Sequence, residues 1–164
     1  MGMNDHYKLG KTIEDIQEGD SLSLTEAIDD SQLMLYLGMT KDTNPLNLLP
    51  DYAKQTHFKK PVIPSGILMN IMLAAVSKHL PGAGSHVVNI SSNFIEPVYH
   101  DETITFHFEV IKIDKMKGVV TISVEATKKQ DEDNNRIIDA VIMVRPPQLV
   151  VEEEEGGILN ESSE

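Results

Sequence analysis

The sequence contains no cysteine and no tryptophan among its 164 residues. The lack of cysteine excludes disulfide bridges, thiol nucleophiles and cysteine-ligated zinc sites. No apolar run reaches the roughly eighteen residues that a membrane-spanning helix needs. The first thirty residues also lack the apolar stretch of a secretory signal. We therefore expect a cytoplasmic protein.

Basic residues are few, since 14 lysines and arginines stand against 26 aspartates and glutamates, for a net charge of −12. Residues 147–164 hold six of these acids and no base. We interpret this segment as an acidic, disordered tail that solubilises the protein or docks a partner. Residues 1–146 are expected to form a single domain. Their acidity argues against sequence-independent nucleic-acid binding, which depends on basic contacts with phosphates.

A helix is predicted over residues 65–80, SGILMNIMLAAVSKHL, where apolar side chains point in almost every direction. Such a helix is buried on all sides. Two other helices are predicted before it. One covers residues 29–40, where acids and a serine can cap the N-terminus. A short one covers residues 49–56, with Pro50 near its first turn.

Beyond residue 86 the apolar residues recur at every second position, which is the spacing of β-strands. Strands are predicted over residues 86–98, 102–113, 118–129 and 136–146, with an earlier strand near residues 20–28. The sets expected to share one face are Val88, Ile90, Ser92 and Phe94; Ile104, Phe106, Phe108 and Val110; Val120, Ile122, Val124 and Ala126; and Ile138, Ala140, Ile142 and Val144. Short polar turns, DKMKG and QDEDNN, predict antiparallel pairing of the last three strands.

The segregation of helices from strands is typical of the α+β class. The simplest packing is a curved antiparallel β-sheet wrapped around the buried central helix.

Residues 42–47, DTNPLN, place an acid, two amides and a proline between predicted helices. Asp42 and Asn44 could simply close an Asx turn ahead of Pro45. Asp42 could instead be a general base, which usually needs an acidic partner. The natural place for that partner holds Asn47, whose amide cannot exchange protons near neutral pH.

The wider stretch YLGMTKDTNPLNLLPDYA resembles the motif of the MaoC-like dehydratases and (R)-specific enoyl-CoA hydratases. That motif begins with an aromatic residue and small residues, followed by Gly-Asp-x-Asn-Pro-aliphatic-His. An Ala or Ser stands six positions after the histidine. The matching residues are Tyr36, Thr40, Asp42, Asn44, Pro45, Leu46 and Ala53. The resemblance extends over about residues 10–146 and implies the hotdog fold.

Three positions depart from the family pattern. Lys41 replaces the glycine before the aspartate, and Asn47 stands at the position of the catalytic histidine. Ser65 and Gly66 stand where the family has His-Gly, and Pro64 is one extra residue before them.

The resemblance implies reversible hydration of a trans-2-enoyl thioester of CoA or acyl-carrier protein to the (R)-3-hydroxyacyl thioester. Asp42 and position 47 would handle protons, and N–H groups near Gly66 would stabilise charge on the thioester oxygen. Asn44 and Ser65 are assigned to substrate binding, although Ser65 could simply cap the helix. Losing one proton-transfer group costs about 10² to 10⁴ in rate, so Asn47 implies weak or altered activity.

Two other functions stay open. A non-catalytic acyl-thioester binder, such as a regulatory subunit, would keep the pocket without the histidine. A thioesterase is possible on the same fold, with Asp42 activating water against the carbonyl carbon.

The lysines and histidines of the sequence indicate which ligands the protein can bind. Four lysines flank the predicted pocket: Lys41, Lys54, Lys59 and Lys60. We expect Lys59 and Lys60 to bind the phosphates of CoA or the carrier group, with a solvated surface as the alternative. Five of the six histidines are interpreted as exposed or interface residues: His57, His79, His86, His100 and His107. No pair of them has metal-ligand spacing, so we predict no metal and no cofactor.

The resemblance also implies assembly. Family members pair at the edge strand that corresponds to VVNISSNF, residues 87–94, to make a continuous sheet. We therefore expect a homodimer or a dimer of dimers.

Overall fold

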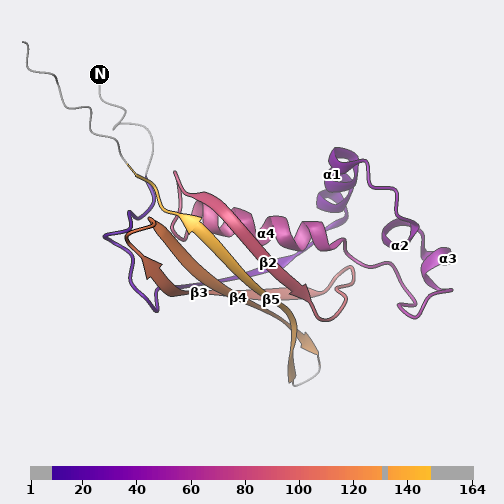
Figure 1. Ribbon diagram of the computed structural model, residues 1–164. Coiled ribbons are helices and arrows are strands. Elements are labelled where there is room, and N and C mark those ends of the chain that lie inside the picture. The colour runs from indigo at the N-terminus through magenta and orange to yellow at the C-terminus, as the bar shows by residue number, and fades with distance from the viewer. Residues whose placement is uncertain (1–8, 131–132, 149–164) are drawn as a thin grey trace, which may run out of the picture.

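A computed structural model describes residues 9–130 and 133–148 of the chain (Figure 1). Its elements, in chain order, are β1 (Ser21–Ala27), α1 (Asp30–Thr40), α2 (Pro45–Leu48), α3 (Pro50–Ala53), α4 (Ser65–Lys78), β2 (His86–Phe94), β3 (Thr103–Asp114), β4 (Val119–Gln130) and β5 (Asp133–Arg145). The expected acidic tail lies outside the described residues, except for residues 147 and 148. None of the helices in the described ranges has the length and apolar character needed to cross a membrane.

The strands form one sheet in the order β1-β3-β4-β5-β2, and every neighbouring pair is antiparallel. The antiparallel pairing predicted for the last three strands is therefore confirmed. The sheet curves past α4, while α1, α2 and α3 gather beyond one end of it (Figure 1). This arrangement confirms the predicted α+β class. β2 lies at one edge of the sheet, as expected for the segment VVNISSNF.

The core lies between α4 and the inner face of the sheet. The predicted inward sets of β3, β4 and β5 are all buried, and Phe106 and Phe108 are its largest fully buried side chains. The set predicted for β2 is wrong at one position, because a register shift between Val87 and Asn89 breaks the alternation. Val87 consequently packs against the core, whereas Val88 is exposed.

Burial of α4 on all sides is also wrong for this chain alone. Leu33 and Leu37 of α1 are buried in the same core cluster as the inward residues of α4. Asn70, Ala74 and Ser77, one helical face, are exposed. This exposed face carries polar or small side chains, and the larger apolar side chains of α4 are buried or partly buried.

The short helix predicted over residues 49–56 is present as α3, which ends at Ala53, and a further short helix, α2, precedes it. Two short helices, α2 and α3, meet at Leu49, whose backbone is extended with φ −111° and ψ 105°. The residue before a proline is disfavoured in the helical region, so Pro50 ends one helix and begins the next. Asn47 therefore lies on a helical turn of its own.

Candidate active site

The loop after α1 holds Asp42 in a defined turn. Lys41 ends α1 in the left-handed region at φ 56°, a conformation that favours glycine. One Asp42 carboxylate oxygen then accepts a hydrogen bond from the Asn44 backbone N–H at 2.9 Å. Asn44 in turn caps α2, because its side-chain oxygen accepts from the Leu46 N–H at 3.1 Å. The Asx turn, one of the two roles left open for these residues, is therefore present.

Asn47 is buried on α2 and is tied to the segment that leads into α4. Its side-chain Nδ2 donates a hydrogen bond to the carbonyl oxygen of Val62 at 2.6 Å. The Val62 N–H donates to the Leu46 carbonyl oxygen at 3.2 Å, which joins the two segments a second time. The side chain of Asn47 is thus a buried structural contact as well as a candidate site residue.

These residues border one cavity of about 580 Å³. The predicted site residues on its wall are Asp42, Asn44, Asn47, Ser65 and Gly66. Tyr36, Phe58, Ile63, Leu68 and Phe94 supply much of its apolar lining. Helices α1, α2 and α4 and the β2–β3 connection all contribute, so the fold brings the separate parts of the sequence motif to a common space.

The N-terminus of α4 opens onto this cavity. Pro64 is the residue before the helix, and no side chain caps it. The alternative role of Ser65 as a helix cap is therefore wrong, because Ser65 is already the first helical residue and makes no capping bond. The first N–H groups of a helix have no intrahelical acceptor, and the helix dipole adds partial positive charge there. This end of the cavity can stabilise a developing anion.

Gly66 is explained by its neighbour. A Cβ atom placed on Gly66 would overlap the hydroxyl oxygen of Tyr36, which comes from α1. A side chain at position 66 would therefore displace the tyrosine. The sequence alone indicated only that this glycine gives a ligand access to the backbone.

Lys59 and Lys60 do not line this cavity. Lys59 is exposed with φ 68°. The Lys60 ammonium lies over the ring of Tyr99, 4.6 Å from its centroid. Lys60 also borders a neighbouring cavity of about 390 Å³, whose wall includes Asn47. Both lysines are near the site without forming its wall.

Among the histidines, His57 is exposed at the rim of the cavity, where its ring stands 4.0 Å from that of Phe58. His100 contacts Asp30 at 3.3 Å, and His107 pairs with Ser23 across the sheet at 3.0 Å. Within residues 9–130 and 133–148, no group of three or more His, Asp or Glu side chains is placed to hold a metal ion.

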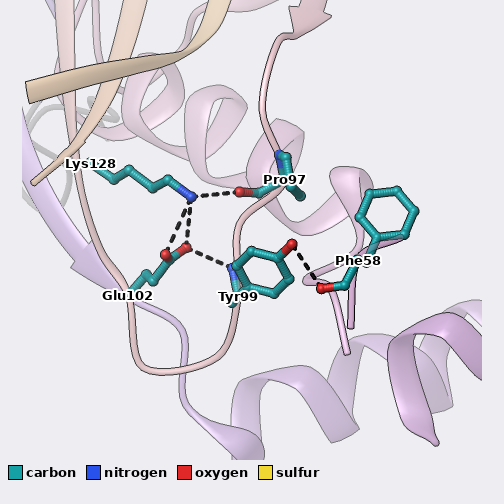
Figure 2. Close-up of polar contacts among 5 residues, drawn as sticks. All are labelled: Phe58, Pro97, Tyr99, Glu102 and Lys128. Carbon is teal, nitrogen blue, oxygen red and sulfur yellow. Dashed lines mark hydrogen bonds and ion pairs between the residues drawn. The ribbon is translucent and has the colours of Figure 1, made fainter. Parts of the chain in front are cut away.

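A polar cluster behind the cavity was missed by sequence reasoning (Figure 2). The ammonium of Lys128, a buried residue of β4, donates to the Pro97 carbonyl oxygen at 2.8 Å and to Glu102 at 3.2 Å. The same Glu102 carboxylate accepts the Tyr99 backbone N–H at 2.8 Å. The inward position of Lys128 was visible in the sequence, because it lies two residues after Ala126 in the alternation that places Ala126 inside.

This cluster supports the cavity wall from outside. The hydroxyl of Tyr99 donates to the Phe58 carbonyl oxygen at 3.1 Å (Figure 2). The backbone of Tyr99 also forms an antiparallel bridge with Val62, the residue that holds Asn47. Pro97 and Phe58 line the cavity themselves. Lys128 is therefore linked directly to Pro97, and through Glu102 and Tyr99 to Phe58 and Val62, all of which line the cavity.

Comparisons with known proteins agree with this architecture. Residues 12–134 match the family model described as "MaoC like domain". The (R)-specific enoyl-CoA hydratase of Rhodospirillum rubrum is 35% identical over 114 residues, which cover 70% of this chain and 79% of that protein. The enzyme of the same name from Aeromonas caviae is 24% identical over 110 residues, 67% of this chain and 82% of that protein.

Solved structures confirm the fold. The (R)-hydratase from A. caviae involved in PHA biosynthesis superposes with a TM-score of 0.75 at 22% identity, covering 82% of this chain and 99% of that one. The unliganded R-hydratase PhaJ1 from Pseudomonas aeruginosa gives a TM-score of 0.76 at 21% identity, covering 85% and 88%. The curved sheet around α4 is thus the predicted hotdog fold, and the chain belongs to the MaoC-like domain family.

Proposed function

We propose that this protein is an acyl-thioester hydratase or dehydratase. It adds water reversibly to a trans-2-enoyl thioester of CoA or acyl-carrier protein and yields the (R)-3-hydroxyacyl thioester. The observation that carries the proposal is the meeting of Asp42, Asn47 and the uncapped start of α4 on one cavity. The curated relatives named (R)-specific enoyl-CoA hydratase support the reaction class.

The reaction needs a base, a proton for Cα and stabilisation of the thioester oxygen. Asp42 takes a proton from water as the water oxygen bonds to Cβ of the enoyl group. The electrons of the double bond move toward the thioester, whose oxygen gains negative charge near the N–H of Gly66. The protonated Asp42 then returns the proton to Cα. Water has been added across the double bond, and no cofactor is consumed.

Asn47 has a positioning role in this scheme. Its Nδ2 is committed to the Val62 carbonyl oxygen. The other amide atom, Oδ1, accepts no hydrogen bond from any residue in the described part of the chain, and it can accept one from the attacking water. An amide cannot transfer the proton, so one carboxylate does the work of two groups. Loss of one such group costs about 10² to 10⁴ in rate, so we expect slow turnover.

Substrate binding extends beyond the cavity. Asn44 and Ser65 line it and are assigned to contacts with the thioester arm. Lys59 and Lys60 lie outside it, where the phosphates of CoA or of the carrier-protein prosthetic group would extend. A local pair of cations is needed because the protein is acidic overall, with a net charge of −12.

Assembly into a homodimer, or a dimer of such dimers, is part of the proposal. β2 is an edge strand, and an uncovered edge offers unpaired backbone groups to a second copy. Light scattering that shows a stable monomer at micromolar concentration would exclude this arrangement. The cytoplasmic location also stays a prediction, which cell fractionation would test.

The test of the function is incubation of the purified protein with crotonyl-CoA. We expect loss of the enoyl absorbance without release of free CoA thiol, and an (R)-3-hydroxybutyryl product. Release of thiol without prior loss of the enoyl band would support the thioesterase alternative. Tight binding of acyl-CoA with neither reaction would support the non-catalytic binder.

A further inference from the structure

We propose that the hydroxyl of Tyr36 is a second hydrogen-bond donor to the thioester oxygen, beside the backbone N–H groups at the start of α4. The inference rests on the proposed function, because it assigns a new catalytic residue to the same cavity. It differs from the roles given above to Asp42, Asn47 and Gly66.

The first observation is the position of the phenol. Tyr36 extends from α1 toward α4, and its hydroxyl oxygen occupies the space that a Cβ on Gly66 would need. The same side chain lines the cavity that Asp42 and Asn47 border. The phenol oxygen therefore lies at the end of the cavity where the N–H groups of Ser65 and Gly66 are free of intrahelical acceptors.

The second observation is that this hydroxyl has no partner in the protein. Among the described residues, none forms a hydrogen bond with the Tyr36 hydroxyl, although the side chain is half-buried. Tyrosine hydroxyls in such places usually find a partner, and the hydroxyl of Tyr99 does so at the Phe58 carbonyl oxygen. A phenol O–H that faces a cavity without a protein acceptor is available to a ligand.

The chemistry favours the thioester oxygen as that acceptor. This oxygen gains negative charge when water adds at Cβ, so a donor aimed at it stabilises the transition state more than the bound substrate. The phenol keeps its proton throughout, and only the strength of the hydrogen bond changes. Asn47 supplies no proton transfer. Stabilisation of the negative charge on the thioester oxygen therefore contributes a larger part of the rate acceleration than it would with a histidine at position 47.

The ring of Tyr36 also separates two cavities, and the test of the hydroxyl must leave this separation unchanged. It borders a second, mostly apolar cavity of about 330 Å³ between α1 and α4, so it separates the two spaces. Replacement by alanine would join the cavities and change substrate binding. Tyr36→Phe keeps the ring and removes only the oxygen.

The experiment compares wild type, Tyr36→Phe and the control Tyr52→Phe. Tyr52 is a partly exposed tyrosine on α3 that lines no part of the cavity. We expect Tyr36→Phe to lower kcat for crotonyl-CoA roughly 10²-fold, the lower end for loss of one oxyanion donor, with little change in KM. Its thermal stability should match the wild type, because no hydrogen bond within the protein is lost. Tyr52→Phe should behave as the wild type in all respects.

A spectroscopic measurement provides a readout that does not depend on turnover. 2,4-Hexadienoyl-CoA is a conjugated thioester whose absorption moves to longer wavelength when its carbonyl oxygen accepts hydrogen bonds. We expect a red shift on binding to the wild type and to Tyr52→Phe, and a smaller one with Tyr36→Phe. Equal shifts and equal kcat for all three proteins would overturn the inference while leaving the proposed function intact.

The two proposals can also fail in other combinations. A wild type that binds the dienoyl thioester with a Tyr36-dependent shift but hydrates nothing would contradict the hydratase function and support the hydrogen bond. A wild type that neither hydrates crotonyl-CoA nor binds the dienoyl thioester would overturn both.

Discussion

Asn47 donates a hydrogen bond of 2.6 Å from its side-chain Nδ2 to the carbonyl oxygen of Val62. This bond joins the helical turn of the DTNPLN motif to the segment that leads into α4. Asn47 is also buried and lines the cavity, so its side chain both holds the structure together and borders the candidate site. Any residue placed there must satisfy the Val62 carbonyl before it can take part in chemistry.

Asn47→His should increase the rate of crotonyl-CoA hydration. An imidazole N–H can replace the donor to the Val62 carbonyl, while the other ring nitrogen can exchange protons near neutral pH. The gain can reach the ~10² to 10⁴ that such a group contributes, measured as loss of enoyl absorbance. The control Asn47→Ala leaves a buried carbonyl unpaired, costs about 1–3 kcal/mol of stability, and should give no gain. A folded Asn47→His protein no faster than wild type would refute the account of this position.

Lys128→Met should destabilise the protein and loosen the cavity wall. It leaves Glu102 and the Pro97 carbonyl oxygen without their shared donor. Removing one partner of a buried pair costs about 3–5 kcal/mol, and the lower end applies because Glu102 is partly exposed. Urea unfolding provides the free energy, and we also expect a higher KM for crotonyl-CoA.

The matched control is Lys115→Met, which breaks an exposed ion pair with Glu14. Exposed pairs contribute about 0–1 kcal/mol, so this variant should unfold close to the wild type. Equal effects of the two substitutions would mean that the Lys128 cluster has no special part in holding the wall.

Gly66→Ala should damage the site through Tyr36. The new Cβ overlaps the tyrosine hydroxyl, and such overpacking costs about 1–3 kcal/mol. We expect a lower Tm and a lower kcat, since the phenol must leave its place. Gly38→Ala on α1 is the control, because its Cβ would meet no atom within 4 Å. An exposed helical Gly→Ala change stabilises a protein by about 0.5–1 kcal/mol. Gly38→Ala should therefore raise the Tm, whereas Gly66→Ala should lower it.

Charge reversal at Lys59 and Lys60 should weaken acyl-CoA binding in calorimetry. The effect should shrink at high salt, because exposed charges are screened. Reversal of Lys115 and Lys117, in the β3–β4 turn at the far end of the sheet from α2 and α3, is the control with the same change in net charge (Figure 1). If both double variants bind acyl-CoA equally well, Lys59 and Lys60 do not bind phosphate.

Much of the fold was predictable, because the apolar periods determine which residues face the core. Phe106 and Ile122 could be placed inside from alternation alone. Val88 could not, since a register shift depends on how β2 pairs with β5, which no local pattern encodes. The division at Leu49 follows from Pro50 and was available in the sequence.

The candidate site was predictable in its motif and less so in its surroundings. The resemblance brought Asp42, Asn47 and Gly66 together, and all three border one cavity. The contact of Tyr36 with Gly66 depends on how α1 packs on α4, which sequence spacing does not determine. Lys128 was overlooked because a lysine in an inward position is rare unless it is paired, and its partners are distant in the sequence.

The central claim is that Asp42 moves the proton, and Asp42→Asn tests it most directly. Asparagine keeps a side-chain oxygen that can accept the Asn44 N–H, so the turn should persist. The measurement is the rate of crotonyl-CoA hydration by wild type and variant, with thiol release followed in the same samples. The account predicts that Asp42→Asn still binds acyl-CoA and that its hydration falls to background. Hydration by Asp42→Asn at the wild-type rate would contradict it, as would a wild type whose only Asp42-dependent reaction is thioester hydrolysis.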